Sequence, residues 1–165
     1  MMRLRRAAAI CAATLAVAGP AGAGEWRIGV GYDDVLEPGE GHATLGAELQ
    51  GGDLLTLGPA GLALGVAARI DADGEFWAGA GPVLRIETGL MGLRAEASVM
   101  PGVYNGGDDG DDLGGPFEIR STIGLSLPVW GPWRLGAEFN HISNAGLHEE
   151  NPGVDSVLVS VGRSF

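Results

Sequence analysis

Lysine is absent from this 165-residue chain, and cysteine occurs once, at Cys11. All ten basic residues are therefore arginines, and three of them lie with Cys11 in the first 23 residues. Beyond residue 23 the chain has no thiol, which excludes disulfides and thiolate metal sites. There, seven arginines stand against 21 acidic residues, a formal charge of −14. Such an acidic chain does not fit nucleic-acid binding, because phosphate contacts need a basic surface.

Long apolar runs are also lacking. The longest, "AAAICAATLAVAG" at 7–19, is shorter than the roughly 20 residues that a transmembrane helix needs. It follows the basic "MMRLRR" and precedes the small residues "AGA" at 21–23. This order of segments predicts a secretory signal peptide, residues 1–23, that is cleaved near Ala23. Residues 24–165 are then expected to form a single domain.

Alternation of apolar and small or polar residues is abundant. Beyond residue 23, large apolar side chains recur at every second position, which is the period of a β-strand. In "WRIGVGY", for example, they alternate with Arg and Gly. This pattern predicts eight strands, at 26–32, 43–50, 62–70, 76–87, 93–104, 117–127, 133–139 and 154–165.

The second face of these segments carries Gly, Ser and Thr, with Arg and Glu at intervals. Small residues and pairable charges suit the narrow lumen of an eight-stranded barrel. The tryptophans near strand ends (Trp26, Trp130 and Trp133) and the final Phe165 suit its aromatic belt. The pattern predicts an all-β fold, an eight-stranded antiparallel transmembrane β-barrel of the bacterial outer membrane. Composition alone leaves a soluble secreted domain as the alternative.

Strand order divides the connections into two groups if both termini are periplasmic. The outer loops are expected near 33–41, 71–75, 105–115 and 144–153. The inner turns are expected near 51–61, 88–91 and 128–132. Three outer loops are acidic, and "DADGE" and "DDGDD" contain fragments of calcium-binding loops. Neither has the full ligand spacing, so we interpret them as solvated loops.

The stretch "FNHISNAGLHEENPGVDS" at 139–156 carries the candidate chemistry. The alternation of side chains along each strand places His141, Ser143 and Asp155 on the apolar, lipid-facing wall, where polar groups cost free energy. His and Ser two positions apart lie within reach of each other, and Asp155 lies beside His141 if the register allows. The set fits the nucleophile, base and orienting acid of a serine hydrolase. The alternative is an ordinary polar rim.

The run "HISNAGLHEENPGVD" at 141–155 resembles the lipid A 3-O-deacylases of the PagL type. The shared features are the H-x-S-N pattern, "AGL", "NPG" and the spacing to the acid. The resemblance implies an active site on the lipid-facing surface of an eight-stranded outer-membrane barrel. In this sequence it implies Ser143 as nucleophile, His141 as base and Asp155 as acid. It also implies that Asn144 and the N–H group of Gly146 stabilise the oxyanion.

The chain departs from the family pattern at the acid, where the family has Glu and this chain has Asp. Glu149 and Glu150, in the loop between the last two strands, are therefore alternative acids. We interpret His42 and His148, in or near outer loops, as bystanders, with His148 a candidate headgroup contact.

The resemblance further implies lipid A, within lipopolysaccharide, as the substrate and a 3-hydroxy fatty acid as the product. It implies no cofactor and no metal ion, and folding by the barrel-assembly machinery of the outer membrane. The rival hypothesis is a non-catalytic small barrel with a structural or surface-display role. A solute pore is disfavoured, because side chains fill the lumen of an eight-stranded barrel.

Overall fold

The structure is a computed structural model that describes residues 24–36, 41–106 and 113–165. The predicted signal peptide, residues 1–23, lies outside the described residues. No helix in the described ranges is long and apolar enough to cross a membrane.

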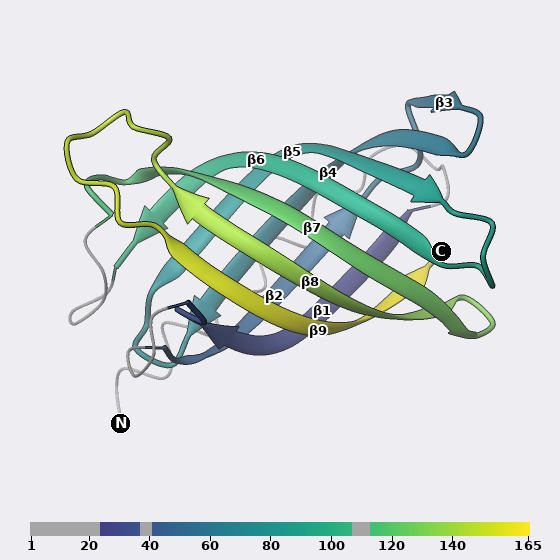
Figure 1. Cartoon of the computed structure of the whole chain (residues 1–165), viewed down its shortest axis with the longest axis horizontal. Helices are drawn as coiled ribbons and strands as arrows, with labels where there is room; N and C mark the ends of the chain where they lie inside the picture. Colours follow the sequence, from purple (N-terminus) through teal and green to yellow (C-terminus); the bar gives the residue numbers. More distant parts are fainter. Residues whose placement is uncertain (1–23, 37–40, 107–112) are drawn as a thin grey trace.

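Eight long strands form a closed antiparallel barrel (Figure 1). Pairing of β1 with β9 and of β2 with β4 closes the ring, which confirms the predicted eight-stranded fold. With one additional short strand, β3, the strands are β1 (Glu25–Asp33), β2 (Ala43–Gln50), β3 (Leu55–Leu57), β4 (Ala60–Asp71), β5 (Phe76–Glu87), β6 (Arg94–Asn105), β7 (Phe117–Trp130), β8 (Trp133–Ser143) and β9 (Val154–Ser164).

The connection predicted as a plain turn at 51–61 is more structured than expected. It contains β3, in which Leu55 pairs with Leu62 and Leu57 with Ala60 of β4. A strand of three residues is too short for a period of two to be recognised, so the sequence did not reveal it. The turn predicted at 128–132 is also shorter, because β7 continues to Trp130 and β8 begins at Trp133.

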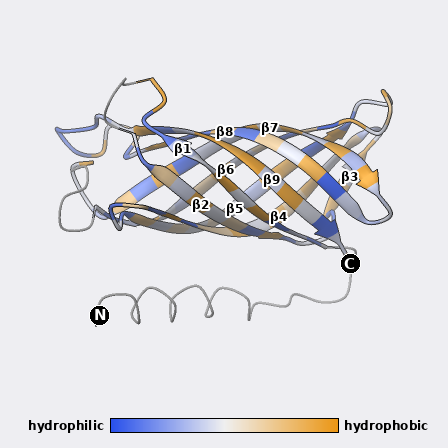
Figure 2. Ribbon diagram, turned by 90° about the horizontal axis from the view of Figure 1, so that it is seen from below, coloured by the Kyte–Doolittle hydropathy of each residue, from blue (hydrophilic) through white to orange (hydrophobic). Residues whose placement is uncertain are grey.

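The two faces of the strands are placed as their alternation predicts. Charged and polar side chains are buried in the lumen, among them Arg27, Glu48, Arg69, Arg85, Glu96, Arg120 and Asn140. Apolar side chains are exposed on the outside, among them Ile28, Val30, Leu45, Leu64, Val99, Ile123, Leu125, Leu135 and Val159. Figure 2 shows hydrophobic and hydrophilic residues alternating along the ribbons. The barrel is thus polar inside and apolar outside, the reverse of a soluble domain.

Ion pairs fill much of the lumen. The guanidinium of Arg27 lies 3.0 Å from Glu25 and 3.5 Å from Glu138, and it also contacts Glu96. These contacts offset the free energy of removing the charges from water.

The two ends of the barrel differ. At the turn end, the backbone N–H groups of Gly24 and Phe165 each donate to the other residue's carbonyl, at 3.1 and 2.9 Å. Trp26 and Trp133 meet edge to face there, with ring centroids 5.5 Å apart. At the opposite end, which we call the loop end, β1, β4, β6 and β8 finish, and the connections after β1, β6 and β8 are long.

Candidate active site

Strands β8 and β9 bring the predicted site residues to the loop end. His141 pairs directly with Asp155, and Ser143 follows two positions later on β8. The intervening residues Asn140 and Ile142 are 2% and 0% exposed and point into the lumen. Because side chains alternate along a strand, His141, Ser143 and Asp155 lie on the apolar outer wall.

The imidazole of His141 contacts the carboxylate of Asp155, with 2.8 Å between Nδ1 and Oδ1. The two side chains are 43% and 23% exposed, so the pair is partly shielded and can still be reached from outside the barrel. When Nδ1–H donates to the carboxylate, Nε2 is left as an acceptor. This is the tautomer that a general base requires.

The register explains how the shorter acid reaches the ring. Directly opposed residues in an antiparallel pair have Cβ atoms about 4.5–5.5 Å apart, so an Asp carboxylate spans the gap without another methylene. Glu149 and Glu150 are exposed in the β8–β9 loop, and within the described chain neither contacts His141. The geometry therefore favours Asp155 over the two loop glutamates.

Ser143 is the last residue of β8 and pairs with Ile119 of β7. Its side chain is half-buried on the same wall as His141. Among the described residues, the Ser143 hydroxyl makes no hydrogen bond to His141. Catalytic hydrogen bonds are often long in free enzymes and shorten when substrate binds. The lack of a Ser143–His141 hydrogen bond is therefore compatible with Ser143 as the nucleophile.

The predicted contact of Asn144 with an oxyanion would require a free donor on its side chain. The residue is fully buried, and its Nδ2 donates to the carbonyls of Leu113 and Glu150 at 2.7 and 2.6 Å. Its Oδ1 accepts the N–H of Gly146 at 2.8 Å. Both side-chain donors of Asn144 are thus engaged, which argues against the predicted contact with an oxyanion. The side chain instead holds the loop that follows Ser143.

That loop begins with a tight turn. The N–H of Leu147 donates to the Asn144 carbonyl at 3.1 Å, and both central residues have positive φ, 55° at Ala145 and 79° at Gly146. A left-handed conformation costs an alanine roughly 1–2 kcal/mol. The backbone beside the candidate nucleophile is therefore held in a strained form that the Asn144 contacts stabilise.

The comparison with known proteins decides the family. A family model described as lipid A 3-O-deacylase (PagL) matches residues 24–164. The chain belongs to this family. The resemblance predicted from residues 141–155 is thereby confirmed over nearly the whole barrel.

Individual family members agree with this assignment. Lipid A deacylase PagL of Bordetella bronchiseptica is 33% identical over 94 residues, which cover 56% of this chain and 52% of the relative. The chain thus matches about half the length of this curated relative.

Solved structures share the fold. The crystal structure of the outer membrane enzyme PagL superposes with a TM-score of 0.67 at 19% identity, covering 84% of this chain and 98% of that one. A de novo designed transmembrane β-barrel superposes with a TM-score of 0.59 at 12% identity, covering 89% and 98%.

In this PagL-family chain, sequence reasoning missed Ser121. The residue pairs with His141 from β7, so Ser121, His141 and Asp155 form a polar row across three strands of the outer wall. Ser121 occupies an apolar-face position of its strand, and a serine there is the signal that could have identified it.

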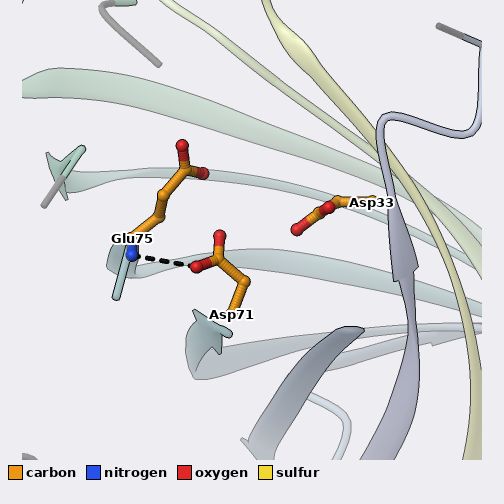
Figure 3. A group of neighbouring side chains, drawn as sticks. All are labelled: Asp33, Asp71 and Glu75. Carbon is orange, nitrogen blue, oxygen red and sulfur yellow. Dashed lines mark hydrogen bonds between the residues drawn. The ribbon is translucent and has the colours of Figure 1, made fainter. Parts of the chain in front are cut away.

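A second group of carboxylates lies inside the same end of the barrel. Asp33, Asp71 and Glu75 place oxygens within 4.8 Å of one another, and they come from the end of β1 and from the β4–β5 hairpin (Figure 3). Nη2 of Arg69 lies 3.1, 3.6 and 3.5 Å from these three carboxylates. The guanidinium supplies the positive charge that a metal ion would supply, so we assign no metal to this cluster.

The two histidines interpreted as bystanders lie in the loops. Nε2 of His42 is 2.9 Å from Oδ2 of Asp73, an exposed contact between two connections. His148 is exposed and lies over Gly115. These contacts give both residues a place in loop packing.

Proposed function

We propose that this protein is an outer-membrane esterase that removes the 3-O-linked hydroxyacyl chain from lipid A, using Ser143, His141 and Asp155. The observation that carries the proposal is the 2.8 Å contact between His141 and Asp155 on the apolar outer wall. Membership of the lipid A 3-O-deacylase family supports the reaction and the substrate.

The proposed reaction is a two-step acyl transfer. Nε2 of His141 takes the proton of the Ser143 hydroxyl as Oγ attacks the ester carbonyl carbon. The C–O bond to the sugar then breaks, and the imidazolium returns the proton to the departing 3-hydroxyl. Water, deprotonated by His141, hydrolyses the acyl-enzyme and releases a 3-hydroxy fatty acid. Asp155 holds the ring and stabilises the imidazolium without taking the proton.

The outward direction of the site suits a lipid substrate. On the same wall, two residues further from the loop end than the polar row, Ile123, Phe139 and Val157 form the next row across β7, β8 and β9. In a membrane this apolar row would lie beside acyl chains, with the site toward the headgroups. Lipid A could then reach Ser143 by lateral diffusion without entering the lumen.

The oxyanion of the tetrahedral intermediate needs hydrogen-bond donors. The N–H of Gly146 remains our candidate, and it would exchange its contact with Oδ1 of Asn144 for the oxyanion. We assign Asn144 a supporting role, because its Nδ2 donors already hold Leu113 and Glu150.

A non-catalytic barrel explains less. It accounts for the closed sheet and the apolar wall, but gives no reason for a hydrogen-bonded His141–Asp155 pair on that wall. Polar groups on the outer face carry a cost that a purely structural barrel could avoid.

Mass spectrometry of lipid A from cells with and without the protein tests the proposal. We expect the expressing cells to lose one hydroxyacyl chain, specifically from position 3. Ser143→Ala should abolish this loss, while Ser164→Ala, at the turn end, should leave it intact. Heat-modifiable migration on gels reports folding separately. Unchanged lipid A with the folded wild-type protein, or full activity of Ser143→Ala, would refute the proposal.

A further inference from the structure

The loop that follows Ser143 is tied to a distant part of the chain. Nδ2 of Asn144 donates to the Leu113 carbonyl at 2.7 Å and to the Glu150 carbonyl at 2.6 Å. Leu113 precedes β7 by four positions, whereas Glu150 belongs to the β8–β9 loop. One buried amide therefore joins the two connections, and it does so at the residue adjacent to the candidate nucleophile.

The Leu113 side chain reinforces this link from within the barrel. It is 1% exposed and belongs to the same buried apolar cluster as Ile142 and Val154. Ile142 and Val154 are paired across β8 and β9, immediately next to the His141–Asp155 pair. The inner side of the candidate site thus packs in a cluster that includes Leu113.

Gly114 leaves no space for a side chain. A Cβ atom there would lie 2.3 Å from the carbonyl oxygen of Glu150 and 3.1 Å from Nδ2 of Asn144. Its φ of +88° also favours glycine. The close approach of the two connections therefore depends on this glycine.

We propose that Leu113 and Gly114 are positioning residues for the candidate active site. They hold the β8–β9 loop through Asn144, so that Ser143 and the turn at Ala145–Gly146 keep their place relative to His141. The inference rests on the proposed function, because it concerns the geometry of that nucleophile. Its physical basis is that a displacement of about 1 Å can lower a rate by about 10²-fold.

Gly74 provides a matched control for the experiment. It has the same φ, +88°, and lies in a loop at the same end of the barrel, but a Cβ atom there would meet nothing within 4 Å. Gly74→Ala therefore introduces the backbone strain alone. Gly114→Ala introduces the same strain and also displaces the Glu150 carbonyl.

The experiment measures kcat and KM for lipid A deacylation by the full-length purified protein, with heat-modifiable migration as the folding control. We expect Gly114→Ala to lower kcat by about 10²-fold with KM little changed. Gly74→Ala should stay within about twofold, since strain without displacement leaves Ser143 in place. A fluorophosphonate, which Ser143 would attack with loss of fluoride, gives a readout without lipid, and we expect the same ranking of labelling rates.

Asn144→Asp serves as a second variant, because it removes both Nδ2 donors without adding bulk. We expect a fall in kcat similar to that of Gly114→Ala, and the double variant should be no slower than the slower single one, since both act through one contact. If Gly114→Ala does not fold, the kcat of folded Asn144→Asp decides alone. Equal kcat in Gly114→Ala and Gly74→Ala, or wild-type kcat in Asn144→Asp, would overturn the inference. An inactive, unlabelled wild-type protein would refute the proposed function instead.

Discussion

Two groups of contacts between acidic and nitrogen-containing side chains lie at the loop end of the barrel, one inside the lumen and one on the outer wall. Inside, Arg69 meets Asp33, Asp71 and Glu75, with every side chain buried. Outside, His141 meets Asp155, and both side chains are partly exposed on the apolar wall.

The difference between the two contacts is one of chemistry. A guanidinium stays protonated at any physiological pH, so Arg69 can neutralise charge but cannot accept a proton. An imidazole that donates through Nδ1 retains an acceptor at Nε2. The inner contact is thus suited to holding strands together, and the outer one to moving a proton. Four predictions test this contrast, beginning with the largest effect.

Removing the charge of the outer acid should have the largest effect. We expect Asp155→Asn to lower the deacylation rate by up to about 10⁴-fold, as in the serine-protease triad, because the ring loses its orienting carboxylate. Kinetics on purified, folded protein would measure this. The double variant Glu149→Gln, Glu150→Gln is the control and should remain close to wild type. If the double variant is inactive while Asp155→Asn remains active, the triad acid lies in the β8–β9 loop.

Removing the inner cation should reduce stability instead. We expect Arg69→Gln to lower the free energy of unfolding by about 3–5 kcal/mol, because buried carboxylates lose their partner. Denaturant unfolding in micelles measures this change. Arg163→Gln is the control, since Arg163 is exposed and lies over the Trp133 ring. An equal loss in both variants would contradict the structural role of Arg69.

Lengthening the outer acid should have a moderate effect. We expect Asp155→Glu to keep its rate within about tenfold of wild type, a change in barrier of about 1.4 kcal/mol. The added methylene must fold back for the carboxylate to reach Nδ1, because the two residues are directly opposed. Steady-state kinetics would measure the change. A loss as large as that of Asp155→Asn would show that the site requires the shorter acid.

Calcium should have the smallest effect. A ligand at one hundred times its Kd would add about 2.7 kcal/mol to the free energy of unfolding. We expect no such gain for the wild-type barrel in millimolar Ca²⁺, because Arg69 already lies among the three carboxylates. Thermal unfolding with Ca²⁺ and with a chelator measures this. A clear calcium-dependent rise in Tm would show that the cluster is a metal site.

Most of the barrel could be predicted because its environment imposes a simple pattern. An apolar exterior and a polar interior require alternation, so a residue such as Val30 or Arg27 could be assigned a face from its position alone. Strand β3 could not be found in this way, because three residues carry too little pattern.

The candidate site was only partly predictable for a related reason. Parity places Ser143 outside and therefore Asn144 inside, so the burial of Asn144 could have been deduced from the next position along the strand. Its contact with Leu113 could not, because that contact joins loops 31 positions apart and depends on how they fold together. Alternation gives the direction of a side chain, whereas contacts between loops require the assembled barrel.

The direct pairing of His141 with Asp155 also has a consequence for assembly. A slip of β8 by one residue would turn His141 and Ser143 into the lumen and turn Arg134, Glu138 and Asn140 toward the hydrocarbon. Among these residues Glu138 lies in the middle of β8, and the free-energy cost of a charged side chain on the lipid-facing wall is largest near the middle of the bilayer, so a lipid environment disfavours the slipped form. The membrane thereby selects between registers, because the pairing with the lower cost of insertion is also the pairing that joins the base to its acid.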